Sequence, residues 1–174
     1  MNIRNQLLKA HSKLNATFIS DFIGNDKVKF DQLVKLFLAN ESRVTQRAAY
    51  SLSISIDKYP SLLDPYIGIL IGNLDNINLH IAVIRNTVRV LQNIEIPKRY
   101  EGKLTTKCFD YLTDNNQPKA VKVFSMTILA NMAKKYPELK NELILIIKDL
   151  MEFGSPGILS RGKKVINQLN SATT

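Results

Sequence analysis

The chain of 174 residues contains one cysteine, two histidines and no tryptophan. A disulfide within the chain is excluded, because Cys108 has no second cysteine to pair with. The longest apolar run, residues 66–71, is far shorter than the roughly 20 residues that a membrane span requires. Polar residues interrupt the first nine positions too often for the apolar core of a signal peptide. We therefore expect a cytoplasmic protein that has no membrane segment.

Sequence motifs for catalysis or metal binding are also missing. No Gly-rich phosphate loop, paired-Cys zinc pattern, His-Glu-x-x-His or Gly-x-Ser-x-Gly occurs. His11 and His80 have no companions at metal-ligand spacing, so we expect His11 at a helix interface and His80 as a surface or capping residue. Cys108 belongs to an apolar helical stripe, which favours a buried side chain over a nucleophile. The sequence therefore predicts no catalytic residue, cofactor or metal site, and a protein that is not an enzyme.

Apolar residues at helical spacing are abundant, most clearly between residues 117 and 153. This stretch predicts two amphipathic helices that are hinged at Lys135-Tyr136-Pro137. Their apolar stripes are Val121, Ser125, Ile128, Leu129 and Met132 in the first helix, and Leu143, Ile144, Ile147, Leu150 and Met151 in the second. Neither helix can bury its stripe alone, so the pair predicts a repeat unit that stacks on its neighbours.

An earlier copy of this unit precedes it in the chain. Its first helix ends at Tyr59-Pro60, because proline disfavours a helical residue before it. We expect its second helix over residues 63–74, with Asp64-Pro65 as the N-cap and first helical residue. Gly68 and Gly72 lie four residues apart, and we expect them to admit a neighbouring helix at close range.

The beginning of the chain predicts another helical hairpin. Ile3, Leu7, Leu14 and Phe18 lie on one apolar stripe, which indicates a single long helix that ends near Gly24. A shorter and more hydrophobic helix follows over residues 29–39. These two helices form the opening hairpin of the predicted array.

The first helices of the later copies align with one another at a constant interval. Val44, Val83 and Val121 correspond, as do Leu52, Leu91 and Leu129, at intervals of 39 and 38 residues. That period is typical of HEAT-like arrays. The sequence therefore predicts an all-α fold with nine helices, a right-handed α-solenoid in one domain over residues 1–174. Its four HEAT-like hairpins are expected at about 1–40, 42–75, 78–114 and 117–153, followed by a capping helix at about 157–170.

The repeats resemble the HEAT/armadillo superfamily, and two segments carry a narrower resemblance. Residues 107–112, Lys-Cys-Phe-Asp-Tyr-Leu, and 119–127, Lys-Ala-Val-Lys-Val-Phe-Ser-Met-Thr, are similar to short bacterial HEAT-like proteins that often carry an adenylosuccinate lyase label. This resemblance extends through most of the chain. Lyases of the fumarase/aspartase superfamily have a Ser-Ser-x-Met-Pro-x-Lys-x-Asn loop, and no stretch here matches it. We therefore transfer no catalytic residue and predict that the chain lacks this activity.

A solenoid of this kind predicts a binding scaffold, with its second helices lining a shallow concave surface for another macromolecule, in the first place a protein. Candidate contact residues on the second helices are those that the apolar stripes do not need. They are Tyr66, Lys103, Lys107, Tyr111 and Lys148. Burial in the core would equally account for the two tyrosines.

The alternative partner is a nucleic acid, because the chain has a net charge of +9. Cations near the polar faces of successive first helices could form a ridge that follows a phosphate backbone, as in HEAT-like DNA alkylation-repair glycosylases. They are Arg47, Arg85, Arg89, Lys122, Arg161 and Lys164. Val123 and Thr127 interrupt this ridge, and a solvated basic face would account for the same residues. The sequence leaves both interpretations open.

Overall fold

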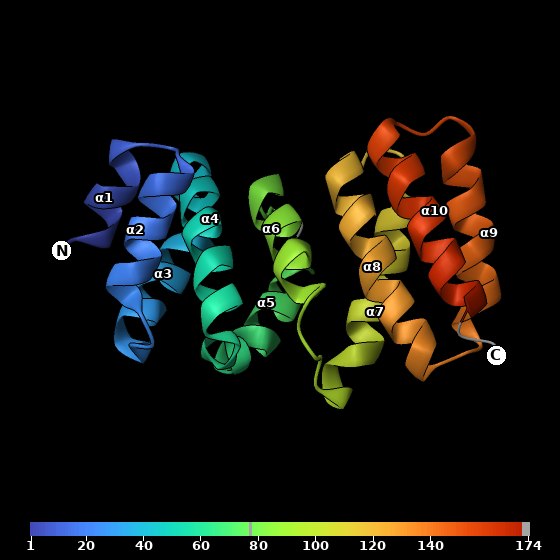
Figure 1. The fold of residues 1–174 in the computed structure, drawn as a ribbon, viewed down its shortest axis with the longest axis horizontal. Helices are drawn as coiled ribbons and strands as arrows, with labels where there is room; N and C mark the ends of the chain where they lie inside the picture. Colours follow the sequence, from blue (N-terminus) through green and yellow to red (C-terminus); the bar gives the residue numbers. More distant parts are fainter. Residues whose placement is uncertain (77, 172–174) are drawn as a thin grey trace. The chain divides into compact units, whose positions relative to one another are not determined.

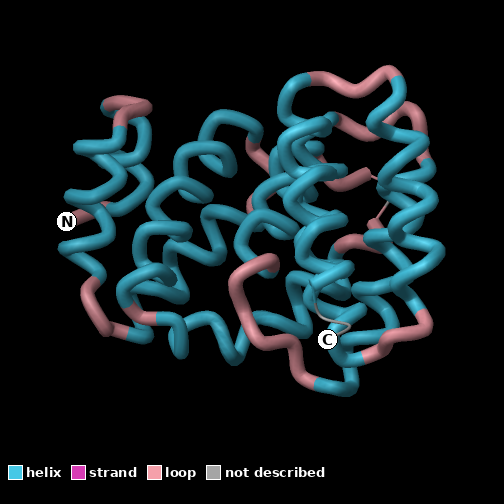
Figure 2. Tube along the Cα trace, turned by 45° about the vertical axis from the view of Figure 1, so that its right-hand side comes forward, coloured by secondary structure: helices cyan, strands magenta, loops and turns pink. Residues whose placement is uncertain are grey.

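The computed structural model describes residues 1–76 and 78–171. Contacts divide the chain into two compact units, Met1–Val90 and Leu91–Thr174. In the described ranges every regular element is a helix, and short loops join the helices (Figure 2). The prediction of an all-helical fold is confirmed. The handedness of the solenoid, the number of hairpins and the single domain stay predictions.

The first unit is built around α4, which packs against α1, α2, α3 and the 3-10 helix η1 (Figure 1). Its elements are α1 (Ile3–Lys9), α2 (Lys13–Ile23), α3 (Lys27–Leu38), α4 (Ser42–Lys58), η1 (Pro60–Tyr66), α5 (Ile67–Asn73) and α6 (Ile81–Leu91), whose last residue opens the second unit. Phe30, Phe37 and Leu52 are fully buried in its core. The apolar stripe of α4 is thereby covered by neighbouring helices, as a stacked repeat requires.

The second unit is built around α8 in the same way. Its helices are α7 (Lys98–Thr113), α8 (Lys119–Lys135), α9 (Leu139–Glu152) and α10 (Pro156–Ser171). Helix α8 packs against α7, α9 and α10, and Leu104, Leu129 and Ile147 are completely buried between them. Leu129 therefore lies in the core, as the alignment of the repeats predicts.

Both central helices end at the predicted Tyr-Pro pairs. The C-cap of α4 is Tyr59, whose backbone N–H donates to Ser55 O, and the C-cap of α8 is Tyr136, whose N–H donates to Met132 O. Pro60 and Pro137 follow and cannot continue the hydrogen-bond ladder of the helix. Both predicted helix ends are confirmed.

The prediction of one long helix at the start of the chain is wrong, because α1 ends at Lys9 and α2 begins at Lys13. Between them, Ala10 has extended backbone angles, φ −153° and ψ 149°. The side-chain nitrogen Nδ2 of Asn15 donates to the carbonyls of Gln6 at 3.0 Å and Ala10 at 2.9 Å. The backbone N–H of Asn15 donates to Ser12 Oγ. These bonds satisfy backbone groups that a continuous helix would have satisfied internally.

Because the helix is broken, the apolar residues of α1 and α2 do not form the one continuous stripe that the sequence predicts. Leu7 is buried, whereas Leu14 is 82% exposed and Phe18 is 53% exposed. The prediction that Leu14 and Phe18 face the core is therefore wrong.

The helix expected over 63–74 is also divided. The 3-10 helix η1 contains Asp64 and Pro65, and α5 begins only at Ile67, with Tyr66 as its N-cap. Pro65 disfavours an α-helical conformation at Asp64, the residue before it, so the regular α-helix begins only after the proline. The described residues form ten α-helices and η1, where the sequence predicts nine helices. A Cβ added at Gly72 would meet no atom of a neighbouring helix within 4 Å, so the close helix approach predicted there is wrong.

Candidate functional site

The outward sides of three second helices each present one large apolar side chain. These residues are Val28 in α3, Ile69 in α5 and Leu145 in α9, and all three are more than half exposed. At 3.6 residues per turn, each lies opposite the buried residues of its own helix. None of the three belongs to a predicted apolar stripe or to the predicted contact residues, although a helical projection shows each of them as an apolar residue outside its stripe.

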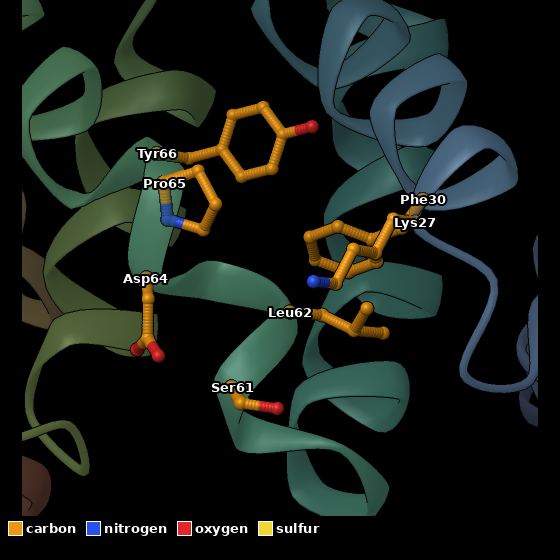
Figure 3. A pocket seen from close by; sticks show the side chains of 7 residues that line it. All are labelled: Lys27, Phe30, Ser61, Leu62, Asp64, Pro65 and Tyr66. Atoms are coloured by element: carbon orange, nitrogen blue, oxygen red, sulfur yellow. The ribbon is translucent and has the colours of Figure 1, made fainter.

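A pocket of about 240 Å³ lies between α3 and η1 in the first unit. Figure 3 shows Tyr66 and Pro65 on one side of the hollow and Phe30, Lys27 and Leu62 on the other. Ser61 and Asp64 complete the lining, so apolar walls are combined with polar groups of both charges. Pockets of this composition suit an apolar side chain of a ligand.

Tyr66 is the sequence candidate that the structure brings to this pocket. Its hydroxyl donates to Asp31 Oδ1 at 3.0 Å, and its ring centroid lies 5.8 Å from that of Phe30. Lys35 Nζ lies 2.7 Å from Asp31 Oδ2, and this bond, followed by the one from Tyr66, lowers the pKa of the carboxyl. Burial, followed by the bond to Asp31, raises the pKa of Tyr66. The ring is therefore fixed in position before any ligand arrives.

The other contact candidates lie in the second unit. Lys103 on α7 is exposed and Lys107 is half-buried. Lys148 on α9 is exposed, one helical turn after Leu145. Tyr111, by contrast, is buried, so its predicted place on a contact surface is wrong. The stripe of α7 is broad enough to take the tyrosine into the core beside Cys108 and Leu112.

Three of the six cations assigned to the basic ridge make contacts inside the fold. Arg47 Nη1 donates to Leu7 O at 2.9 Å, near the end of α1. Lys122 Nζ donates to Leu112 O at 3.0 Å, near the end of α7. Arg161 donates to Thr127 Oγ1 and, at 3.4 Å, to Gln92 Oε1. The first two cations lie beside the negative end of a helix dipole, a favourable position.

Lys122 is only 6% exposed, so its predicted place on an exposed ridge is wrong. Its long side chain turns inward because the Leu112 carbonyl offers its ammonium a partner at the end of α7. Arg85 is half-buried, while Arg89 and Lys164 are exposed. The six residues therefore do not share one solvent-facing role.

Glu101, Lys135 and Tyr136 form a hydrogen-bonded cluster that joins two helices. Glu101 is buried on α7 and accepts from Lys135 Nζ at 2.7 Å and from the Tyr136 hydroxyl at 2.5 Å. These two bonds, the one from Lys135 first, lower the pKa of Glu101. The contact joins the end of α8 to α7, so a structural role is enough to explain the lowered pKa of Glu101.

The cysteine and the two histidines are the remaining residues that could take part in catalysis or metal binding. Burial raises the pKa of Cys108 to about 12, so the thiol stays protonated and the predicted burial is confirmed. His80 Nδ1 accepts the N–H of Ala82 at the start of α6, which confirms its capping role. His11 is exposed, with its ring centroid 6.2 Å from that of Tyr50.

Within residues 1–76 and 78–171, no group of three or more His, Cys, Asp or Glu could hold a metal ion. None of the helices in these ranges is both long and apolar enough to cross a bilayer.

These observations define an all-helical protein whose α3, α5 and α9 each expose a large apolar side chain. The family model of the HEAT repeat domain matches residues 3–169. The chain therefore belongs to the HEAT repeat family, whose repeats generally act as scaffolds for protein interaction. No curated protein and no solved structure matches the chain.

Proposed function

We propose that this chain is a non-enzymatic cytoplasmic scaffold that binds another protein through the surface of its second helices. The observation that carries the proposal is the pocket between α3 and η1, with Tyr66 fixed by Asp31 at its edge. A rigid aromatic ring beside an apolar hollow is a frequent anchor point in protein interfaces. An apolar side chain of the partner would occupy the hollow.

Site-specific photo-crosslinking in the source cell tests this proposal. A photoreactive residue replaces Asp64, which lines the pocket, and in a control replaces Gln46, which is exposed on the first helix α4. We expect a discrete protein adduct from position 64 that position 46 does not give. Ser61→Trp, which fills the hollow, should remove that adduct, whereas Gln46→Trp should leave it intact. Equal adducts from both positions, or an adduct that survives Ser61→Trp, would contradict the proposal.

The arrangement of the cations does not favour the nucleic-acid alternative, because Arg47, Lys122 and Arg161 are engaged inside the fold. We therefore expect DNA to bind weakly and non-specifically, with dissociation constants of roughly 10⁻⁴ to 10⁻⁶ M at physiological salt. A salt series on the wild type and on the Arg85→Glu/Arg89→Glu variant measures this. Submicromolar binding that persists at physiological salt and is lost in the variant would contradict the protein-scaffold proposal and support nucleic-acid binding.

The resemblance to proteins labelled adenylosuccinate lyase raises a separate question of activity. We propose that purified protein does not convert adenylosuccinate to AMP and fumarate, because no acid/base pair or signature loop for this elimination occurs in the sequence. Turnover that stays with the protein through successive purification steps would overturn this part of the proposal.

A further inference from the structure

The pocket between α3 and η1 has an apolar floor and a charged rim. Its floor contains Phe30, which is fully buried, and Leu62, which is 3% exposed. Lys27 and Asp64 are the charged residues of its rim, and both are exposed. Its volume of about 240 Å³ is below the roughly 300–1,000 Å³ of sites that hold whole small molecules. The hollow therefore suits one apolar side chain that belongs to a larger partner.

The ammonium group of Lys27 is available to such a partner. The other two lysines of α3 have carboxylate partners, since Lys29 pairs with Asp26 and Lys35 pairs with Asp31. Within the part of the chain that the structure describes, Lys27 forms no hydrogen bond or ion pair. It is therefore a cation at the edge of an apolar hollow whose charge no neighbour balances.

The position of this cation favours a negative charge in the ligand. Figure 3 shows the Lys27 ammonium directed toward the hollow, while the carboxylate of Asp64 extends away from the Tyr66 ring. The net charge of +9 also attracts an acidic partner over distances longer than a contact. Both the local and the overall charge thus complement a ligand that combines an apolar side chain with a carboxylate.

The carboxylate of a protein partner can be its C-terminus or the side chain of an Asp or Glu. Terminal carboxylates are typically held by a nest of backbone N–H groups. At the start of α3 the N–H groups of Val28 and Lys29 already donate to Asp26 Oδ1, at 2.9 Å and 3.1 Å. The single flexible ammonium of Lys27 remains, and it suits a side-chain carboxylate, which needs no such nest.

We infer that the pocket binds a segment of the partner in which a large apolar residue has an Asp or Glu at the next position or the one after. The apolar side chain packs between Tyr66 and the floor at Phe30, and the carboxylate pairs with Lys27. This inference rests on the proposed function, because it uses the same pocket, and it adds the chemistry that the partner must have.

Selection from a phage-displayed library of random peptides tests the two requirements separately. Peptides that bind the wild-type chain are kept only if they no longer bind Ser61→Trp, which fills the hollow. We expect the retained peptides to share a large apolar residue with an Asp or Glu beside it. Retained peptides that lack the acid would overturn this inference and leave the proposed function intact. A selection in which no peptide depends on the hollow would contradict both.

An exchange of charges tests the role of Lys27. Fluorescence anisotropy measures the binding of one retained peptide and of a version in which lysine replaces its acid. Lys27→Glu should weaken binding of the acidic peptide by about tenfold or more, because like charges then face each other. The same variant should bind the lysine version more tightly than the wild type does. Lys27→Arg keeps the charge and should keep the preference for the acidic peptide.

Lys13→Glu is the matched control, because Lys13 is the exposed first residue of α2 as Lys27 is the exposed first residue of α3. An acidic residue in the first turn of a helix is favourable, so both variants should retain the helical circular dichroism of the wild type. Lys13→Glu should leave both affinities unchanged. An equal loss in the two variants, an acidic peptide that Lys27→Glu binds as tightly as the wild type, or a lysine version that gains nothing would each overturn the inference.

Discussion

The two central helices end in the same tripeptide, Lys58-Tyr59-Pro60 in α4 and Lys135-Tyr136-Pro137 in α8. The backbone at the two tyrosines is nearly identical, with φ −136° and ψ 71° in the first unit and φ −128° and ψ 81° in the second. Local sequence is enough to explain this similarity, because proline ends the helix in both cases and the tyrosine N–H closes the last turn.

The side chains of the two corners, however, have different partners. Lys58 pairs with Asp21, and both side chains are largely exposed. Lys135 pairs with Glu101, whose side chain is only 6% exposed and which also accepts the hydroxyl of Tyr136. The same local motif therefore makes a solvent-screened ion pair in one unit and a buried junction in the other. The acid comes from a different helix, so tertiary packing decides how much the motif contributes.

The largest effect is expected where the two units are most alike, in the cores of α4 and α8. Leu52→Ala and Leu129→Ala each remove a buried side chain from the same repeat position, and each should lower the free energy of unfolding by about 2–5 kcal/mol. Urea denaturation followed by circular dichroism measures both losses. A loss below about 0.5 kcal/mol for either variant would be typical of a surface position and would contradict the shared register.

The two lysines at the corners should give unequal effects. Lys135→Met leaves the buried Glu101 carboxylate with one hydrogen bond fewer, whereas Lys58→Met leaves Asp21 in solvent. We expect Lys135→Met to lower the midpoint of thermal unfolding by several degrees and Lys58→Met to change it little. Equal shifts, or a larger one for Lys58→Met, would show that burial of the acid does not distinguish the two corners.

The second corner should also respond to acid. The folded state lowers the pKa of Glu101 below its ordinary value of 4.5, so below that pH the unfolded chain binds more protons than the folded one. The stabilisation is complete above pH 4.5 and is lost as pH falls through the lower pKa of the folded state. Unfolding free energies from pH 7 to pH 3 should therefore show wild type and Glu101→Gln converging at the acid end. If the difference in unfolding free energy between wild type and Glu101→Gln stayed constant with pH, Glu101 would be excluded as the source of the acid sensitivity.

The smallest effect comes from two glycines of the second unit. Gly102 is exposed within α7, and an added Cβ would meet no atom of another helix within 4 Å, so Gly102→Ala should stabilise the fold by up to about 1 kcal/mol through helix propensity. At Gly162 in α10 the same Cβ would meet Met151 Sδ at 2.5 Å and Ile147 Cγ2 at 3.0 Å. Gly162→Ala should therefore lack this gain in the same denaturation assay. An equal gain at both sites would show that α9 and α10 do not pack closely there.

The fold was predictable wherever a residue acts on its own neighbours in the chain. Pro60 and Pro137 end helices whatever surrounds them, and the stripes of α4 and α8 identify their buried sides. The break between α1 and α2 was not predictable in this way, because Leu7 and Leu14 fit one continuous stripe. It depends on Asn15, whose side-chain amide reaches back to two earlier carbonyls.

The candidate site was less predictable than the fold, because it depends on contacts between distant residues. Lys122 is polar and falls near the line of the predicted basic ridge, but it turns toward a carbonyl of the preceding helix. Tyr66 was identified by position, yet its pocket exists only because η1 returns toward Phe30. Glycine spacing in α5 also gave no guide to the close approach at Gly162, which depends on a methionine of the neighbouring helix.

The buried thiol of Cys108 gives the chain an internal reporter of local opening. It is the only thiol of the sequence, it lies in the core of the second unit, and its raised pKa of about 12 leaves almost no thiolate at neutral pH. A thiol reagent can react only during excursions that admit solvent to α7, so the labelling rate measures how often this unit opens. The first unit has no such group, and a cysteine introduced into its core would allow the opening of both units to be timed with one reagent.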